Sequence, residues 1–141
     1  MKNVINQVTA KSISSLINNQ DNLPNEITPD IILEEEHQYL YKFDDNGDII
    51  VCLQLRKNIW YQYEIKYVST AEKHQHQGYA SSLMKEAEKE AGKMGCQFLQ
   101  CAIMEDKIRS IGLFNKMGFF QVSQFFNPFN GHNVGVGYKV L

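Results

Sequence analysis

The stretch EKHQHQGYASSLMKEAEKEAGK, from Glu72 to Lys93, changes character at its centre. Its first part is polar, and from Gly78 onward it has the periodicity of an amphipathic helix. The apolar positions on one face of that helix are Tyr79, Leu83, Ala87, Ala91 and Met94. A strand-like segment, Ile59–Thr70, precedes the stretch. The first amides of a helix lack internal partners and carry the positive end of the helix dipole, so this strand-to-helix turn predicts an anion site.

Gly78 is the residue on which this expectation depends. Without a Cβ it lets a phosphate approach the main chain, and Ala80 and Ser81 keep the first turn of the helix slim. The turn is neither a dinucleotide fingerprint, which needs three glycines, nor a Walker A loop, which needs Gly-Lys-Ser/Thr. The alternative that Gly78 only supplies the turn stays open on spacing alone.

Downstream, strand-like and helix-like segments follow one another. Gly95 ends the long helix as a residue that tolerates positive φ. Strand, helix, strand is a βαβ unit, so its two strands are expected to be parallel neighbours. The expected segments are a strand at Gln97–Ile103, a helix at Lys107–Met117 ended by Gly118, and strands at Phe119–Phe126 and Val134–Leu141. The core face expected for the helix at Lys107–Met117 consists of Ile108, Ile111, Phe114 and Met117.

Upstream, weak alternation indicates a first strand, two helices follow, and three antiparallel strands come in succession. Asn46-Gly47 is a strong hairpin signal between the first two of those strands. A cap, a proline and an acid mark the start of the second helix. The expected segments are a strand at Asn3–Thr9, helices at Ala10–Asn19 and Thr28–Glu36, strands at Tyr39–Phe43 and Asp48–Leu55, and a turn at Arg56–Asn58 before Ile59–Thr70.

Length and composition describe an ordinary globular chain. The 141 residues predict one domain, spanning residues 1–141, with 43% apolar and 21% charged residues. The net charge of −2 offers no basic field for nucleic acid, and no segment reaches the about 18 apolar residues of a membrane span. The N-terminus lacks the apolar core of a signal peptide. Cys52, Cys96 and Cys101 include no C-x-x-C pair, and free thiols favour a cytoplasmic location.

Two motifs resemble those of a known family. Gln75-His76-Gln77-Gly78-Tyr79-Ala80 is similar to the (Q/R)-x-x-G-x-(G/A) signature of the GNAT superfamily, the acyl-CoA-dependent N-acyltransferases. Ser110–Phe119 resembles the second signature, a helix that ends in a bulky residue, a basic residue, Gly and Phe. The similarity covers most of the chain, although the region before Tyr39 matches only in layout. The resemblance implies an α+β fold with a splayed, mixed sheet and helices on both faces.

The resemblance also implies a binding site for acetyl-CoA, used as a co-substrate. The diphosphate is expected on the main-chain amides of the signature loop, and the pantetheine arm is expected along the end of the preceding strand. The residues implied for the diphosphate are Gln75, His76, Gln77, Gly78, Tyr79, Ala80 and Ser81, and those implied for the arm are Val68, Ser69 and Thr70. Lys107 and Phe114 occupy positions of the second signature that contact the cofactor in the family.

Acyl transfer to an amine needs a base, an oxyanion donor and, in some enzymes, an acid. Glu64 is the candidate base, because protein-acetylating members carry a glutamate at the same offset before the signature. The alternative is a surface glutamate paired to Lys66. The family's acid is a tyrosine where this chain has Phe114, and its asparagine is replaced by Lys107. Tyr138 is a candidate substitute for the acid.

The remaining signals are weaker. His74 and His76 lack further ligands, so no metal is expected, and His132 is read as a polar loop residue or an alternative base. The predicted function is N-acetyltransfer from acetyl-CoA to a primary amine acceptor of unknown identity, small molecule or protein. The alternative is an acyl-CoA-binding regulatory protein of the same fold with little turnover, which Phe114 and Lys107 keep open. The aromatic final strands could pair between subunits of a homodimer.

Overall fold

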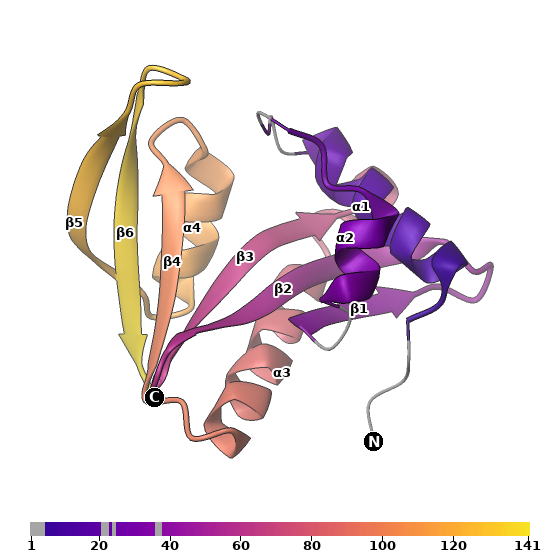
Figure 1. The fold of residues 1–141 in the computed structure, drawn as a ribbon, viewed down its shortest axis with the longest axis horizontal. Helices are drawn as coiled ribbons and strands as arrows, with labels where there is room; N and C mark the ends of the chain where they lie inside the picture. Colours follow the sequence, from indigo (N-terminus) through magenta and orange to yellow (C-terminus); the bar gives the residue numbers. More distant parts are fainter. Residues whose placement is uncertain (1–4, 21–22, 24, 36–37) are drawn as a thin grey trace. The chain divides into compact units, whose positions relative to one another are not determined.

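The computed structural model describes residues 5–20, 23, 25–35 and 38–141. The described residues form two compact units (Figure 1). The first combines the residues up to Leu55 with Tyr67–Ala87, and the second combines Arg56–Lys66 with Glu88–Leu141. Six strands form one sheet, in the order β1 (Tyr39–Phe43), β2 (Ile49–Ile59), β3 (Gln62–Thr70), β4 (Phe98–Met104), β6 (His132–Val140) and β5 (Phe120–Asn127). Since the sheet is mixed and helices accompany it, the predicted α+β class is confirmed. None of the described helices is long and apolar enough to cross a membrane.

In the first unit, α1 (Gln7–Gln20) packs its apolar face into a core shared with α2, β1 and β2. Asn6 begins α1, because its Oδ1 accepts the Thr9 amide at 2.8 Å. The predicted strand Asn3–Thr9 is therefore wrong where the chain is described: residues 7–9 are already helical. Residues 3 and 4 lie outside the described part. The fully buried side chains of this core include Ala10, Ile13, Ile17, Ile32 and Cys52.

The second predicted helix is α2 (Pro29–Glu34), and Thr28 caps it by accepting the Ile31 amide at 3.3 Å. Strand β1 (Tyr39–Phe43) pairs antiparallel with β2 (Ile49–Ile59), as predicted. The hairpin turn between them ends at Gly47, which has φ 83°. The predicted turn at Arg56–Asn58 is wrong, because β2 runs through these residues and the chain turns at residues 60–61. The polar side chains of this segment suggested a turn, but they are polar because this end of the strand is exposed to solvent.

Strand β3 (Gln62–Thr70) begins in the second unit and pairs there in parallel with β4 (Phe98–Met104), from Gln62↔Phe98 to Glu64↔Gln100; from Tyr67 onward it belongs to the first unit. Strand β4 pairs antiparallel with β6 (His132–Val140), and β6 pairs antiparallel with β5 (Phe120–Asn127). The helix α4 (Ile108–Lys116) connects β4 to β5. The βαβ prediction is thus confirmed for the pair β3 and β4.

The long helix α3 (Tyr79–Lys93) runs through both units. Leu83, Ala87 and Ala91 are buried as predicted, but Met94 is 44% exposed because the helix has already ended at Lys93. On α4, Phe114 and Met117 are buried, whereas Ile108 is 71% exposed in the first turn. Gly95 has φ 83°, which confirms it as the residue that ends α3.

Candidate functional site

The turn between β3 and α3 (Tyr79–Lys93), together with the first residues of α3, contains most of the predicted cofactor residues. A short 3-10 helix (η2, Glu72–His74) follows β3, and His76 and Gly78 both adopt positive φ, at 63° and 83°. Only a glycine adopts the second value without strain. A Cβ built on Gly78 would meet no atom within 4 Å, so the space beside this main chain is open.

The amides that open α3 point beyond the helix. The first intrahelical hydrogen bond runs from the Ser82 amide to the Gly78 carbonyl at 3.0 Å. The preceding amides of Tyr79, Ala80 and Ser81 have no intrahelical acceptor, as helix geometry requires. Gly78 has no side chain that could cap them. The arrangement can hold an anion by several parallel N–H donors at the positive end of a dipole.

The loop's glutamine side chains fold back onto the chain behind the turn. Gln75 Nε2 donates to the Thr70 carbonyl at 3.2 Å, and Gln77 Nε2 donates to the Lys73 carbonyl at 3.4 Å. These amide groups therefore brace the loop itself. The signature glutamine, Gln75, acts here as a support between β3 and the loop.

A second support comes from the β1–β2 turn. Asp44 Oδ2 lies 3.2 Å from His74 Nε2, and the His74 ring meets the Tyr79 ring edge-on at 5.8 Å. The Asp44 pKa is lowered, chiefly by the hydrogen bond from the Asp48 amide, with smaller contributions from His74, Asn46 and Lys73 opposing the effect of burial. Asp44 thus stays ionised beside His74. Sequence analysis missed this residue, because its Asp-x-Asn-Gly context indicated only a turn.

At the end of β3, Thr70 already has main-chain partners. The Gln20 side chain of α1 accepts the Thr70 amide at 3.1 Å, and its Nε2 donates to the Thr70 carbonyl. Ser69 is 1% exposed, with its hydroxyl donating to the Tyr67 carbonyl at 3.0 Å. Tyr67 has φ 55°, which interrupts the regular alternation predicted for this strand. Val68, the third residue predicted for the pantetheine arm, has neither the Gln20 contact of Thr70 nor the near-complete burial of Ser69.

The candidate base and acid lie on neighbouring strands of the second unit. Glu64 is opposite Gln100 on β4, and Gln100 is opposite Tyr138 on β6. Directly opposed residues of a sheet share a face, so these three side chains lie in a row. Gln62 Nε2 donates to the Tyr138 hydroxyl at 3.3 Å and to Gln100 Oε1. Asn58 Nδ2 donates to Gln100 Oε1 at 2.9 Å, which extends this polar network.

Cys101 lies beside this row, with its thiol toward Gly137. Burial raises the Cys101 pKa to about 11; a hydrogen bond with Gly137 opposes the rise, and the charge of Glu64 adds to it. Cys52, Cys96 and Cys101 are all buried, and none of the three forms a disulfide with another described residue. A thiol held protonated is no nucleophile, so Cys101 acts here as a small buried side chain.

The two predicted residues of the second signature lie at opposite ends of α4. Lys107 is the residue that begins α4 and makes no side-chain cap bond. Phe114 is 5% exposed and packs edge-on against Phe119 at a ring distance of 4.9 Å. It lines a cleft of about 140 Å³ between α4 and the strands β4, β5 and β6.

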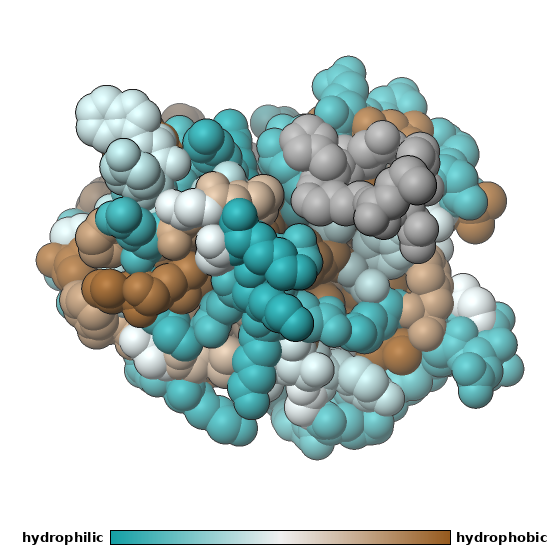
Figure 2. Space-filling model, turned by 90° about the horizontal axis from the view of Figure 1, so that it is seen from below, coloured by the Kyte–Doolittle hydropathy of each residue, from teal (hydrophilic) through white to brown (hydrophobic). Residues whose placement is uncertain are grey.

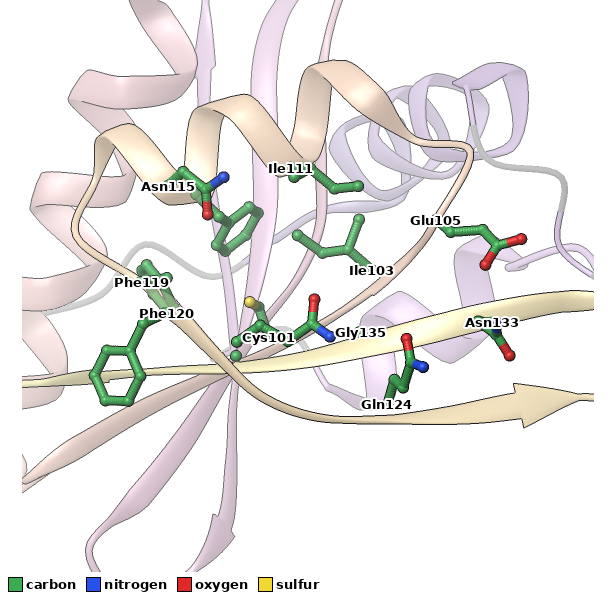
Figure 3. A pocket seen from close by; sticks show the side chains of 13 residues that line it. Cys101, Ile103, Glu105, Ile111, Asn115, Phe119, Phe120, Gln124, Asn133 and Gly135 are labelled. Carbon is green, nitrogen blue, oxygen red and sulfur yellow. The ribbon is translucent and has the colours of Figure 1, made fainter.

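Figure 3 shows this cleft from close by. The Phe119 and Phe120 rings close one end, Glu105 and Asn133 lie at the other, and Ile103 and Ile111 face each other between them. The floor includes Gly135 and Gly137. The cleft therefore has an apolar middle, and polar side chains lie at both ends, with Asn115 near Phe119 and with Glu105 and Asn133 opposite.

The histidines form no metal centre in the described part of the chain, where no group of three potential ligands occurs. His74 pairs with Asp44, as described above. His132 lies 3.7 Å from both Glu105 and Asp106, so its surroundings are acidic. The described predicted residues divide between the units: the loop and Val68–Thr70 belong to the first, and Glu64, Lys107, Phe114 and Tyr138 to the second.

Comparison with known proteins gives one family. The model of the Acetyltransferase (GNAT) family matches residues 10–119. A search of curated protein sequences gives no match.

Solved structures agree on the fold. The chain is similar to a subunit of the NatC complex bound to Gag peptide and CoA, with TM-score 0.86, 14% identity, and coverage of 99% of this chain and 95% of that one. It is also similar to a putative phosphinothricin N-acetyltransferase, with TM-score 0.79, 18% identity, and coverage of 99% and 96%. A third is Rv2747 from Mycobacterium tuberculosis in complex with CoA and NLQ, with TM-score 0.80, 12% identity, and coverage of 99% and 98%. Identities this low establish the fold alone.

Proposed function

The chain belongs to the GNAT acetyltransferase family, and on that premise we propose that it is an N-acetyltransferase that moves the acetyl group of acetyl-CoA to a primary amine. The observation that carries this proposal is the open start of α3, where the amides of Tyr79, Ala80 and Ser81 follow a glycine with φ 83°. Two of the similar structures contain CoA, which supports the same cofactor here.

The loop fits a diphosphate. Main-chain N–H groups between Gln77 and Ser81 would donate to its oxygens, and the absence of any atom near a Gly78 Cβ leaves it room. The side chains of Gln75 and His74 hold the loop in shape behind these donors. The pantetheine arm would pair with the main chain of β3 at Val68, and at Thr70 once the Gln20 side chain has moved away.

The two residues proposed to act on the reacting groups, Glu64 and Tyr138, belong to the second unit. The amine nitrogen attacks the thioester carbonyl carbon, a C–N bond forms, and the C–S bond breaks. Glu64 accepts the proton that the amine loses, directly or through a water molecule. The Tyr138 hydroxyl accepts a hydrogen bond from Gln62, so its own hydrogen remains available for the departing sulfur. A thiol pKa of about 8.5 also allows the sulfur to leave as a thiolate, so a missing acid at Phe114 is no obstacle.

The position of Glu64 supports its role. It lies two strands from Tyr138 on the same face, about 10 Å apart at the main chain from the usual strand spacing. Gln100, between them, is held by Gln62 and Asn58 and orders this face. Phe114 and Lys107 remain proposed contacts of the cofactor, with Phe114 as an apolar wall and Lys107 as a cation at the start of α4.

Release of the free thiol, measured across a panel of primary amines, tests the proposal. Glu64→Gln is expected to lower kcat by about 100-fold with the KM for acetyl-CoA almost unchanged, because a general base contributes to the chemical step alone. Glu90→Gln is the matched control. Glu90 lies in the last turn of α3, where it pairs with Lys93, so this variant should retain full activity.

Two results would contradict the proposal. Tight binding of acetyl-CoA without thiol release on any amine would indicate a binding protein and remove the catalytic part. An unchanged pH–rate profile in Glu64→Gln would leave the transferase in place but take the role of base from Glu64.

A further inference from the structure

Strand β5 (Phe120–Asn127) forms an open edge of the sheet. It is the last strand in the sheet order and pairs only with β6. Seven of its eight residues are exposed. Edge strands carry unpaired N–H and C=O groups along their outer side, and these groups can pair with another strand.

The usual protections of such an edge are sparse here. No charged side chain occurs from Phe119 to Gly131, and Pro128 lies just beyond the strand. The one protective device is a bulge at Val122, where the register with β6 shifts between Gln121 and Ser123. From Ser123 to Asn127 the pairing with β6 is regular again, so this half of the edge is straight enough to accept a neighbour.

The same half carries exposed aromatic side chains on both faces of the sheet. Phe125 lies opposite Val134 and Phe126 opposite Asn133, so they point to opposite faces. Phe125 is 51% exposed, Phe126 61%, and Phe129, just past the strand, 90%. Figure 2 views the molecule from below, and brown, apolar surface occurs there on the same side as β5 and β6 in Figure 1; the second half of β5, at the top of Figure 1, lies on the far side of that view.

The area suffices for a specific contact. A phenylalanine buries about 150–250 Å² when fully covered, so the exposed fractions of the four phenylalanines from Phe120 to Phe129 amount to roughly 500 Å². Main-chain atoms and the exposed polar side chains of the strand add to this. A standard interface buries about 800 Å² on each partner, which is within reach of this edge and its two flanking faces.

We propose that two copies of the chain pair their β5 strands antiparallel about a two-fold axis, through the segment Ser123–Asn127. Antiparallel pairing of identical strands is self-complementary, and it uses up both open edges, so the assembly closes as a dimer. An uncharged segment pairs with its own copy without repulsion, and the aromatic side chains of one copy then lie beside those of the other. A charged peptide would find no opposite charge here that selects it.

Light scattering after size-exclusion chromatography, over about 1–100 µM protein, tests the proposal by mass action. The wild-type protein is expected to be dimeric at the upper end of this range. Phe125→Lys and Phe126→Lys, at exposed positions, should each weaken dimerisation at least tenfold, so that the measured mass halves. Ile59→Lys is the matched control: Ile59 is 61% exposed, like Phe126, and lies outside this edge. The Ile59→Lys variant should therefore remain dimeric over the same concentrations as the wild-type protein.

Hydrogen exchange of the wild-type protein gives a measurement that needs no variant. The amides of Ser123–Asn127 are expected to exchange more slowly at high than at low concentration. A monomer throughout the range, a dimer that survives both lysine variants, unchanged exchange in this segment, or assemblies larger than a dimer would each overturn the proposal. None of these results bears on acetyl transfer, so this proposal and the proposed function fail separately.

Discussion

The helices of the first unit begin in two different ways. At α1 and α2 the chain supplies its own cap: Asn6 accepts the Thr9 amide at 2.8 Å, and Thr28 accepts the Ile31 amide at 3.3 Å. At α3 the corresponding position is Gly78, which has no side chain to offer. Glycine in place of a capping side chain costs only roughly a few tenths of a kcal/mol, and the burial of Leu83 and Met84 on α3 exceeds that amount. A helix held by its core can therefore leave its amides to a ligand.

The largest effect on CoA affinity is expected from a negative charge at the uncapped start of α3. Gly78→Glu should weaken CoA binding by at least about 100-fold, because a carboxylate would stand where the diphosphate is proposed to lie, and like charges in close contact repel by several kcal/mol. Isothermal titration with CoA measures the loss, and thermal unfolding shows whether the fold persists.

Gly95 offers the matched control for this substitution. It has the same φ of 83° and equally open surroundings, and it lies just past the end of α3. Gly95→Glu thus introduces the same backbone strain and the same charge, away from the loop. Equal loss of CoA affinity in both variants would show that strain, and not the ligand, explains the effect at Gly78.

The capped helix should respond in the opposite way. Thr28→Ala removes the hydroxyl that accepts the Ile31 amide and should lower the free energy of unfolding by about 1 kcal/mol. CoA affinity should stay unchanged, because α2 presents no predicted cofactor residue. Urea unfolding and titration of the same sample measure both quantities. A variant with normal stability and weaker CoA binding would contradict the distinction between structural and ligand-binding helix starts.

A smaller effect is expected at the strand that leads into the open helix. Gln20 bonds both main-chain groups of Thr70, which the cofactor's arm is proposed to use. Gln20→Ala should therefore raise CoA affinity by about threefold to tenfold, since net hydrogen bonds are worth about 0.5–1.5 kcal/mol each. Titration measures the change, with Asn19→Ala, the adjacent residue of α1, as the control. Weaker binding in Gln20→Ala would mean that the glutamine supports the strand end that the cofactor needs.

Sequence patterns predicted the parts of this molecule that local chemistry determines. Thr28-Pro29-Asp30, Asn46-Gly47 and Gly95 gave correct starts, turns and ends, because each acts on its immediate neighbours. The strand predicted at Asn3–Thr9 was wrong because the weak alternation in this segment was given more weight than Asn6. The Asn6 side chain acts on its near neighbours as a helix cap. The polar Arg56–Asn58 segment failed because the end of a long strand can be solvent-exposed.

The candidate site was predictable only where it lies in one segment. The signature loop was predicted from its motif and the family resemblance, but two contacts around it come from distant segments: Asp44 from the β1–β2 turn bonds His74, and Gln20 from α1 bonds Thr70. The network that joins Gln62, Gln100 and Tyr138 depends on the register of three strands, which no local pattern encodes. Family resemblance suggested Glu64, and Tyr138 was proposed as a substitute for the tyrosine that Phe114 replaces; the register adds that the two share a face.

The smallest expected effect tests whether the loop's outer support matters to the open helix start. Asp44→Asn keeps an oxygen for the Asn46 and Asp48 amides but removes the charge beside His74. His74 contacts Tyr79, the first residue of α3, so CoA affinity should fall by about threefold, within the usual range for one ion-pair partner. Asp45→Asn, the neighbouring acid of the same turn, is the control.

The same variant should change stability only in one range of pH. Because the folded pKa of Asp44 lies below its ordinary value of 3.8, its contribution is fully present above that value and is lost as pH falls through the lowered folded pKa. The difference in Tm between wild type and Asp44→Asn should therefore be constant from about pH 7 to pH 5 and shrink toward zero in stronger acid. A difference that grows on acidification would mean that Asp44 carries its proton in the folded state. The carboxylate then could not hold His74, and the support of the open helix start would have to come from Gln75 alone.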